Sequence, residues 1–188
     1  MLVKKLVIMK YLKLYEELDF RRGNSSFRRK KRHSDAFVEY LSTVDGIKYE
    51  ISFERQFGNF WTRDYENAEH VGFDYSQTNK NPLKIISAVT DVTEDFIKKY
   101  NPDAIIIHHI NMKNEICETD KLNKRAKINY YYLKDIKGYN LVYYNQLTGN
   151  NQEVRTTNCI LYKKGIDISP IRKKLSSTFW DNCILVQP

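Results

Sequence analysis

The chain has 188 residues, a length that fits one domain with an appended arm and leaves little room for two full domains. Hydrophobic residues make up 41% of it and aromatic residues 13%, with only 7 Gly and 4 Pro, so the composition excludes a disordered or low-complexity chain. The formal net charge of +8 favours an anionic partner, such as nucleic acid, an acidic protein face or a membrane surface.

Hydropathy and cysteine usage bear on the compartment. No apolar run reaches the roughly 20 residues that a membrane-spanning helix needs. The three cysteines (Cys117, Cys159 and Cys183) are odd in number and widely spaced, which predicts free thiols rather than a disulfide framework or a zinc site. We therefore expect an unsecreted protein, in the cytoplasm of a bacterial host or in a virion.

The N-terminal part divides into two segments. Residues 1–20 are predicted to form an amphipathic helix, because apolar residues recur there at spacings of three and four. Residues 21–35 are predicted to be a basic linker or arm, and residues 36–188 a single α/β domain. The expected polyanion-binding residues of the arm are Arg21, Arg22, Arg28, Arg29, Lys30, Lys31 and Arg32.

The domain is predicted to open with a β-hairpin. Residues 36–43 and 47–54 form the strands around the turn Asp45-Gly46. The second strand alternates strictly, so Ile51 and Phe53 should face a core and Lys48 and Ser52 should face away from it. A loop then leads to a third strand at residues 70–75.

Helices and strands alternate in the rest of the chain. Residues 82–100 favour one helix, although a strand at 83–89 before a shorter helix is an alternative. A buried strand at 104–107 and a helix at 122–136 follow. Strands at 139–146 and 154–162, a short helix after Pro170 and a strand at 183–186 complete the chain. This order predicts an α/β (α+β) fold, in which two main helices cover a mixed, mostly antiparallel sheet.

Few residues form a recognisable chemical motif. His108 and His109 are adjacent, so in a strand they point to opposite faces and cannot share a metal; one should be buried and the other exposed. No metal is expected. Neither a phosphate-binding glycine loop nor a nucleophile elbow occurs. The tyrosine-rich stretch from Tyr130 to Tyr144 is more simply a packed helix and strand than a base-stacking surface.

One stretch resembles a known family. The run Asn123-Lys124-Arg125-Ala126, followed by Tyr130, resembles the late helix of GNAT-family N-acyltransferases, and Gly138-Tyr139 matches the Gly-aromatic pair that opens their next strand, one helical turn later than usual. The resemblance implies a GNAT-like element order and acyl-CoA as cofactor. It also implies that Tyr130 is a general acid and that Asn123 contacts acyl-CoA. The sequence departs from the family at residues 76–82, which contain no glycine where the pyrophosphate-binding loop should lie.

The opening residues and the Asn-, Lys-, Ile- and Tyr-rich composition also resemble small bacteriophage proteins. Our first interpretation is therefore a non-enzymatic, phage-type accessory or virion-associated protein without a cofactor. On this interpretation the α/β domain contacts a protein partner or assembly, and the basic arm contacts nucleic acid or an acidic surface. The alternatives are a GNAT-like N-acyltransferase that uses acyl-CoA, and a plain nucleic-acid-binding module.

Overall fold

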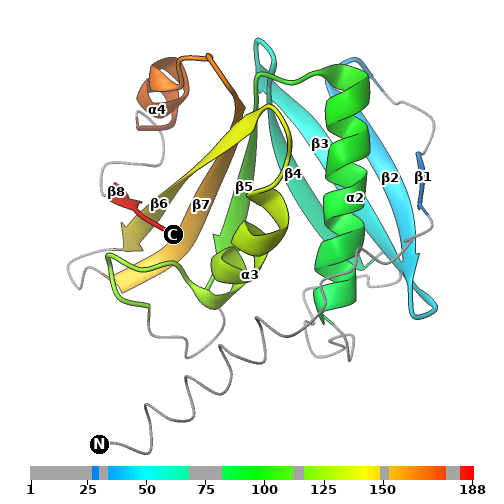
Figure 1. Ribbon diagram of the computed structural model, residues 1–188, viewed down its shortest axis with the longest axis horizontal. Helices are drawn as coiled ribbons and strands as arrows, with labels where there is room; N and C mark the ends of the chain where they lie inside the picture. The colour runs from blue at the N-terminus through cyan, green and yellow to red at the C-terminus, as the bar shows by residue number, and fades with distance from the viewer. Residues whose placement is uncertain (1–26, 30–33, 68–81, 112–116, 149–152, 177–182) are drawn as a thin grey trace, which may run out of the picture.

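One eight-stranded sheet runs through the computed structural model, which describes residues 27–29, 34–67, 82–111, 117–148, 153–176 and 183–188 (Figure 1). The elements are β1 (Phe27–Arg29), β2 (Phe37–Val44), β3 (Ile47–Phe57), β4 (Phe60–Asn67), α2 (Pro82–Tyr100), β5 (Ala104–Ile110), α3 (Lys124–Leu133), β6 (Tyr139–Thr148), β7 (Glu153–Lys163), α4 (Ser169–Ser176) and β8 (Cys183–Val186). The strand order in the sheet is β1-β2-β3-β4-β5-β7-β6-β8. Neighbours are antiparallel except β4 and β5, which are parallel and are joined through α2.

The predicted hairpin is present as β2 and β3. Asp45 and Gly46 have φ values of 50° and 83°, and two successive positive φ values are what a tight two-residue hairpin turn requires. Ile51 and Phe53 are fully buried, whereas Lys48 is exposed and Ser52 is half-buried. The alternation in the sequence therefore correctly predicts which face of this strand is buried.

The structure places a strand, β4, where a loop was expected after the hairpin, at Phe60–Asn67. Residues 70–75, where we expected the third strand, lie outside the described residues. The alternation was hidden because the inward positions carry Trp61 and the charged Arg63, both fully buried. A buried arginine makes this strand resemble a polar loop in the sequence.

Two helices cover one face of the sheet. α2 lies across β2, β3 and β4, and α3 lies across β5 (Figure 1). The single helix expected at residues 82–100 is confirmed. Its inward side chains Val89, Val92 and Phe96 are buried at helical spacing. They pack on Phe53 and Trp61 of the sheet in the main core.

The central strand β5 is buried on both faces, as its β-branched run predicts. Ile105 and Ile107 face the main core under α2 and α3. Ile106 belongs to a second core on the opposite face, where it packs with Ile160 of β7 and Ile171 of α4. The sheet is thus covered by α2 and α3 on one side and by α4 on the other.

α3 is shorter than the expected 122–136. It ends at Leu133, and a turn leads to Gly138, whose φ of 83° suits glycine. Tyr139 then opens β6, and its hydroxyl donates to the carbonyl oxygen of Pro102 at 2.6 Å. The Gly-aromatic pair therefore opens a strand, as the resemblance implies, and the extra residues before it lie in the turn rather than in the helix.

The predicted N-terminal helix at residues 1–20 lies outside the described residues. Within the expected arm, Phe27–Arg29 forms β1 and pairs antiparallel with β2 at the edge of the sheet. None of the helices in the described residues is long and apolar enough to span a membrane.

Candidate functional site

The two parallel strands at the centre of the sheet part from each other. β4 and β5 pair from Phe60↔Ala104 to Arg63↔Ile107, yet β4 continues to Asn67 and β5 to Ile110. Beyond Arg63 and Ile107, each strand keeps its other neighbour, β3 or β7. The facing edges therefore carry backbone groups that no strand pair within the described residues satisfies. In open α/β sheets, ligands bind at the carboxyl ends of parallel strands, which makes this parting the candidate site.

Arg63 lies at the point where the strands part, on the face covered by α2 and α3. Only 1% of the residue is exposed. Its Nη1 donates to Oγ1 of Thr93 on α2 at 3.0 Å, and its Nη2 donates to Oδ1 of Asn129 on α3 at 3.4 Å. Its Nε has no hydrogen-bond partner among the described residues. Burial lowers the pKa of the guanidinium from its ordinary value, although arginine stays charged in proteins.

His109 follows on the same face of β5 and is 4% exposed. In the part of the chain that the structure describes, no group hydrogen-bonds its Nε2. Burial lowers the pKa of the imidazole to about 3, and the charges of Arg63 and Arg125 add to this effect. His109 is therefore neutral near pH 7. His108 is exposed on the other face, where its Nδ1 lies 2.6 Å from Oδ1 of Asn158, so the expectation of one buried and one exposed histidine is confirmed.

Asn123 joins the start of α3 to the end of β5. Its Oδ1 accepts from the backbone N–H of Ala126 and caps the helix, while its Nδ2 donates to the carbonyl oxygen of His109 at 2.6 Å and to Oδ1 of Asn111 at 2.7 Å. The residue is 1% exposed. Both amide hydrogens and one oxygen lone pair are thus used within the protein, and the side chain has little capacity left for a ligand.

Tyr130 lies about two turns further along α3, roughly 10 Å from Asn123 along the helix axis. Its half-buried ring packs edge-on against Tyr143 of β6 (centroids 6.3 Å apart) and against Tyr131 (5.7 Å). No residue in the described part of the chain hydrogen-bonds its hydroxyl. Below it, burial raises the pKa of the Tyr143 hydroxyl, and burial raises the pKa of the neighbouring Cys159 thiol to about 12. Both groups therefore stay protonated.

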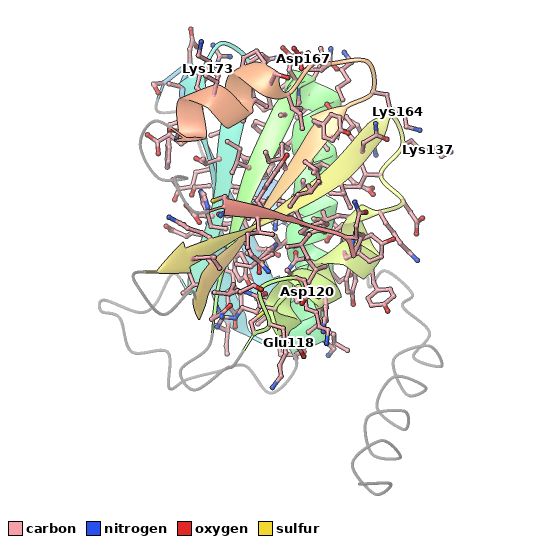
Figure 2. All side chains as sticks on the ribbon, turned by 90° about the vertical axis from the view of Figure 1, so that its left-hand side faces the viewer. Glu118, Asp120, Lys137, Lys164, Asp167 and Lys173 are labelled. Atoms are coloured by element: carbon pink, nitrogen blue, oxygen red, sulfur yellow. The ribbon has the colours of Figure 1, made fainter. Side chains whose placement is uncertain are left out.

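Acidic residues near this end of the sheet lie at the surface. Figure 2 shows Glu118 and Asp120 at the end of the molecule where α3 begins, and Asp167 and Lys173 at the opposite end. Glu118 pairs with Lys121, with 2.6 Å between Oε2 and Nζ. No group of three or more His, Cys, Asp or Glu that could hold a metal occurs among the residues described.

The basic arm contributes one described side chain. Arg28 is exposed on β1 at the edge of the sheet, whereas the side chains of the other expected polyanion-binding residues lie outside the described residues. Polyanion binding by the arm stays a prediction.

The sequence interpretation missed Arg63, Thr93 and Asn129. An arginine at an inward position of the alternating stretch from Phe60 to Tyr65 is the signal that would have identified the first of them.

Comparisons with known proteins find similar chains among solved structures. No protein-family model matches the chain, and no curated protein matches it. Among solved structures, it is similar to a ribosomal-protein-S5-alanine acetyltransferase from Vibrio fischeri, with 14% sequence identity and a TM-score of 0.42. The alignment covers 71% of this chain and 65% of that chain, so it spans less than two thirds of the acetyltransferase's length.

The comparisons correct our first interpretation, a non-enzymatic, phage-type accessory or virion-associated protein. None of them supports a phage origin, and the structure to which the chain is similar is an acetyltransferase. The expected fold class is confirmed as a mixed, mostly antiparallel sheet covered by two main helices, in a GNAT-like order. At 14% identity the likeness concerns the fold alone.

Proposed function

We propose that the protein is an N-acyltransferase that takes its acyl group from acyl-CoA. The observation that carries this proposal is the parting of β4 and β5 after Arg63 and Ile107, which leaves open backbone groups at the carboxyl ends of two parallel strands. The pantetheine arm of acyl-CoA carries amide groups, and an extended chain with amides binds an open strand edge as an added strand does.

Tyr130 supports the proposal as the proton donor. Its hydroxyl accepts or donates no hydrogen bond among the described residues, and its ring is fixed against Tyr143. In the reaction, the nitrogen of the acceptor amine attacks the thioester carbonyl carbon and the C–S bond breaks. Tyr130 would give its proton to the departing thiolate and regain one from solvent, which also receives the proton of the amine.

Asn123 supports the site in a different way from the one that the resemblance implies. Because its side chain caps α3 and bridges to His109 and Asn111, we assign it the role of fixing the start of α3 against the end of β5. Residues 76–81, at the place of the family's phosphate-binding loop, contain no glycine and lie outside the described residues. Acyl-CoA binding is therefore the first step to measure.

The first experiment is a thermal-unfolding series with acetyl-, propionyl- and succinyl-CoA, and with free CoA for comparison. A ligand that binds only the folded state raises the Tm by mass action, and we expect at least one acyl-CoA to do so. If saturating amounts of all of these compounds leave the Tm unchanged, the proposal is wrong.

The second experiment measures acyl transfer to a panel of amines with Tyr130→Phe and Tyr131→Phe. The first variant removes the proposed proton donor, and we expect kcat to fall about 100-fold or more. Tyr131 is a matched control, because it is the next residue on α3 and is 40% exposed. Equal kcat values for the two variants would remove Tyr130 from the mechanism.

A further inference from the structure

Arg63 is a buried cation without a counter-charge among the described residues. It is 1% exposed, and the hydrogen-bond partners that the described part of the chain gives it are the neutral side chains of Thr93 and Asn129. No carboxylate in the described part of the chain forms an ion pair with it; its sequence neighbour Asp64 is exposed. Removing a guanidinium from water without an anion is costly, and proteins retain such groups mainly at functional sites.

One edge of the guanidinium makes few hydrogen bonds among the described residues. The pair formed by Nε and Nη2 is the edge that binds a carboxylate through two parallel hydrogen bonds. Within the described residues Nε has no partner, and the Nη2 bond to Asn129 is long at 3.4 Å. By contrast, Nη1 donates to Thr93 at 3.0 Å. The arginine is therefore held mainly through Nη1, and the edge formed by Nε and Nη2 has hydrogen-bonding capacity left.

His109 adds a second unused polar atom on the same face. Arg63 lies opposite Ile107 in the parallel register, and His109 is the next residue of β5 to face α2 and α3. Its Nε2 has no partner within the described ranges, and it can donate a hydrogen bond when that nitrogen carries the proton. Arg125 of α3 acts electrostatically on the same imidazole and adds positive charge to the surroundings. The donors and charges around this point suit an anion and not a cation.

We propose that Arg63 and His109 form a binding site for the carboxylate group of a small-molecule ligand that enters where β4 and β5 part. Arg63 holds the carboxylate through Nε and Nη2, and His109 donates a third hydrogen bond. This site needs no acyl transfer to bind its ligand, so it stands apart from the proposed function. If the protein is an acyltransferase, the carboxylate belongs either to a dicarboxylic acyl group or to an amino-acid acceptor.

The direct test uses butyrate as probe and its neutral analogue butyramide as control, at constant ionic strength and near neutral pH. Within the described residues Arg63 is the one buried arginine, so its Nε–H signal in the NMR spectrum of the isotope-labelled wild-type protein should be protected from exchange. We expect butyrate to shift this signal and to raise the Tm, and butyramide to do neither. An Nε–H signal that butyrate does not move overturns the inference.

Two matched variants separate binding from folding. Arg63→Lys keeps the charge but loses the two-pronged edge, and we expect butyrate affinity to fall by about tenfold to a hundredfold. Arg55→Lys makes the same exchange at an exposed arginine that lies over Trp61, and it should leave the affinity unchanged. If Arg63→Lys folds and binds butyrate as the wild type does, Arg63 only ties β4 to α2 and α3. If it does not fold, the wild-type NMR titration decides.

Two further pairs identify the source of the carboxylate in the full-length wild-type protein. Succinyl-CoA and butyryl-CoA differ at the far end of a four-carbon acyl group, and glycine and glycinamide differ at the acceptor end. A preference for succinyl-CoA assigns the carboxylate to the donor, and a preference for glycine assigns it to the acceptor. If butyrate binds but the protein prefers neither succinyl-CoA nor glycine, the carboxylate site is upheld. That result would count against acyl transfer as the reaction for which the protein uses this site.

Discussion

The rings of Phe53 on β3 and Phe96 on α2 stack face to face, with their centroids 3.8 Å apart and their planes 3° from parallel. Trp61 and Tyr100 extend this contact, because Phe96 meets the Trp61 ring edge-on at 5.0 Å and stacks on Tyr100 at 4.7 Å. The aromatic cluster fixes α2 on β3 and on β4, the strand that carries Arg63.

Phe96→Ala is expected to destabilise the protein by about 3–5 kcal/mol, because it removes a fully buried ring and leaves a cavity between the helix and the sheet. Tyr131→Ala, at a 40% exposed ring of α3 that contacts Tyr130 edge-on, should cost only about 1 kcal/mol. Denaturant unfolding of both variants measures the difference. Equal losses would mean that α2 does not pack on the sheet through Phe96.

The hairpin gives a second contrast. Ile51 is fully buried and pairs with Tyr40 across the strands, whereas Ser52, the next residue, is half-buried on the other face. Ile51→Ala should cost about 2–5 kcal/mol, and Ser52→Ala about 0.5 kcal/mol or less. Because a register shift of one residue would exchange the two faces, similar losses in denaturant unfolding would contradict the observed pairing.

The regular elements could be predicted because their patterns are local. The strict alternation of β3, the helical spacing of α2 and the β-branched run of β5 each indicate which side chains face the core. The strand β4 could not be predicted in the same way. Its inward position 63 carries an arginine, and a buried charge makes sense only together with Thr93 and Asn129, which lie 30 and 66 residues away.

The candidate site depends on relationships that no short stretch of sequence contains. The parting of β4 and β5 is a property of pairing between strands, and the sequence shows only their separate lengths. Asn123 and Tyr130 were identified by resemblance, yet the number of bonds that Asn123 makes within the protein became visible only in the structure. The burial of His109 and the exposure of His108 were simpler to predict, because adjacent residues in a strand point to opposite faces of the sheet.

Asn123 leads to a third prediction. Asn123→Ser keeps a capping oxygen for α3 but loses the amide that satisfies the buried carbonyl oxygen of His109. Asn123→Ala loses both. We expect losses of about 1–3 kcal/mol for the serine variant, and a further loss of about 1 kcal/mol for the alanine variant.

The measurement is denaturant unfolding, combined with the KM for acyl-CoA where transfer is detectable. If Asn123 fixes α3, replacing it lowers the free energy of unfolding. The loss should be smaller for Asn123→Ser than for Asn123→Ala. An Asn123→Ser protein of wild-type stability with a much weakened KM for acyl-CoA would instead place Asn123 in contact with the donor, as the family resemblance implies.

His109 gives a pH dependence whose sign follows from its burial. The folded-state pKa is about 3, far below the ordinary value of 6.5 that applies to the unfolded chain. Between these values the unfolded chain binds a proton and the folded protein does not, so stability falls as the pH falls through this window and recovers as it rises. The expected slope from His109 is about 1 kcal/mol per pH unit below pH 6.

His109→Gln removes this contribution, whereas His108→Gln removes an exposed imidazole and should preserve the slope. Unfolding curves from pH 5 to pH 7 for the three proteins measure the effect. All three share the same carboxylates, so the pH dependence that these contribute cancels when the slopes are compared. A His109→Gln slope identical to that of the wild type would mean that the imidazole takes up a proton in the folded state, and that the surroundings of Arg63 are wetter than the buried contacts indicate.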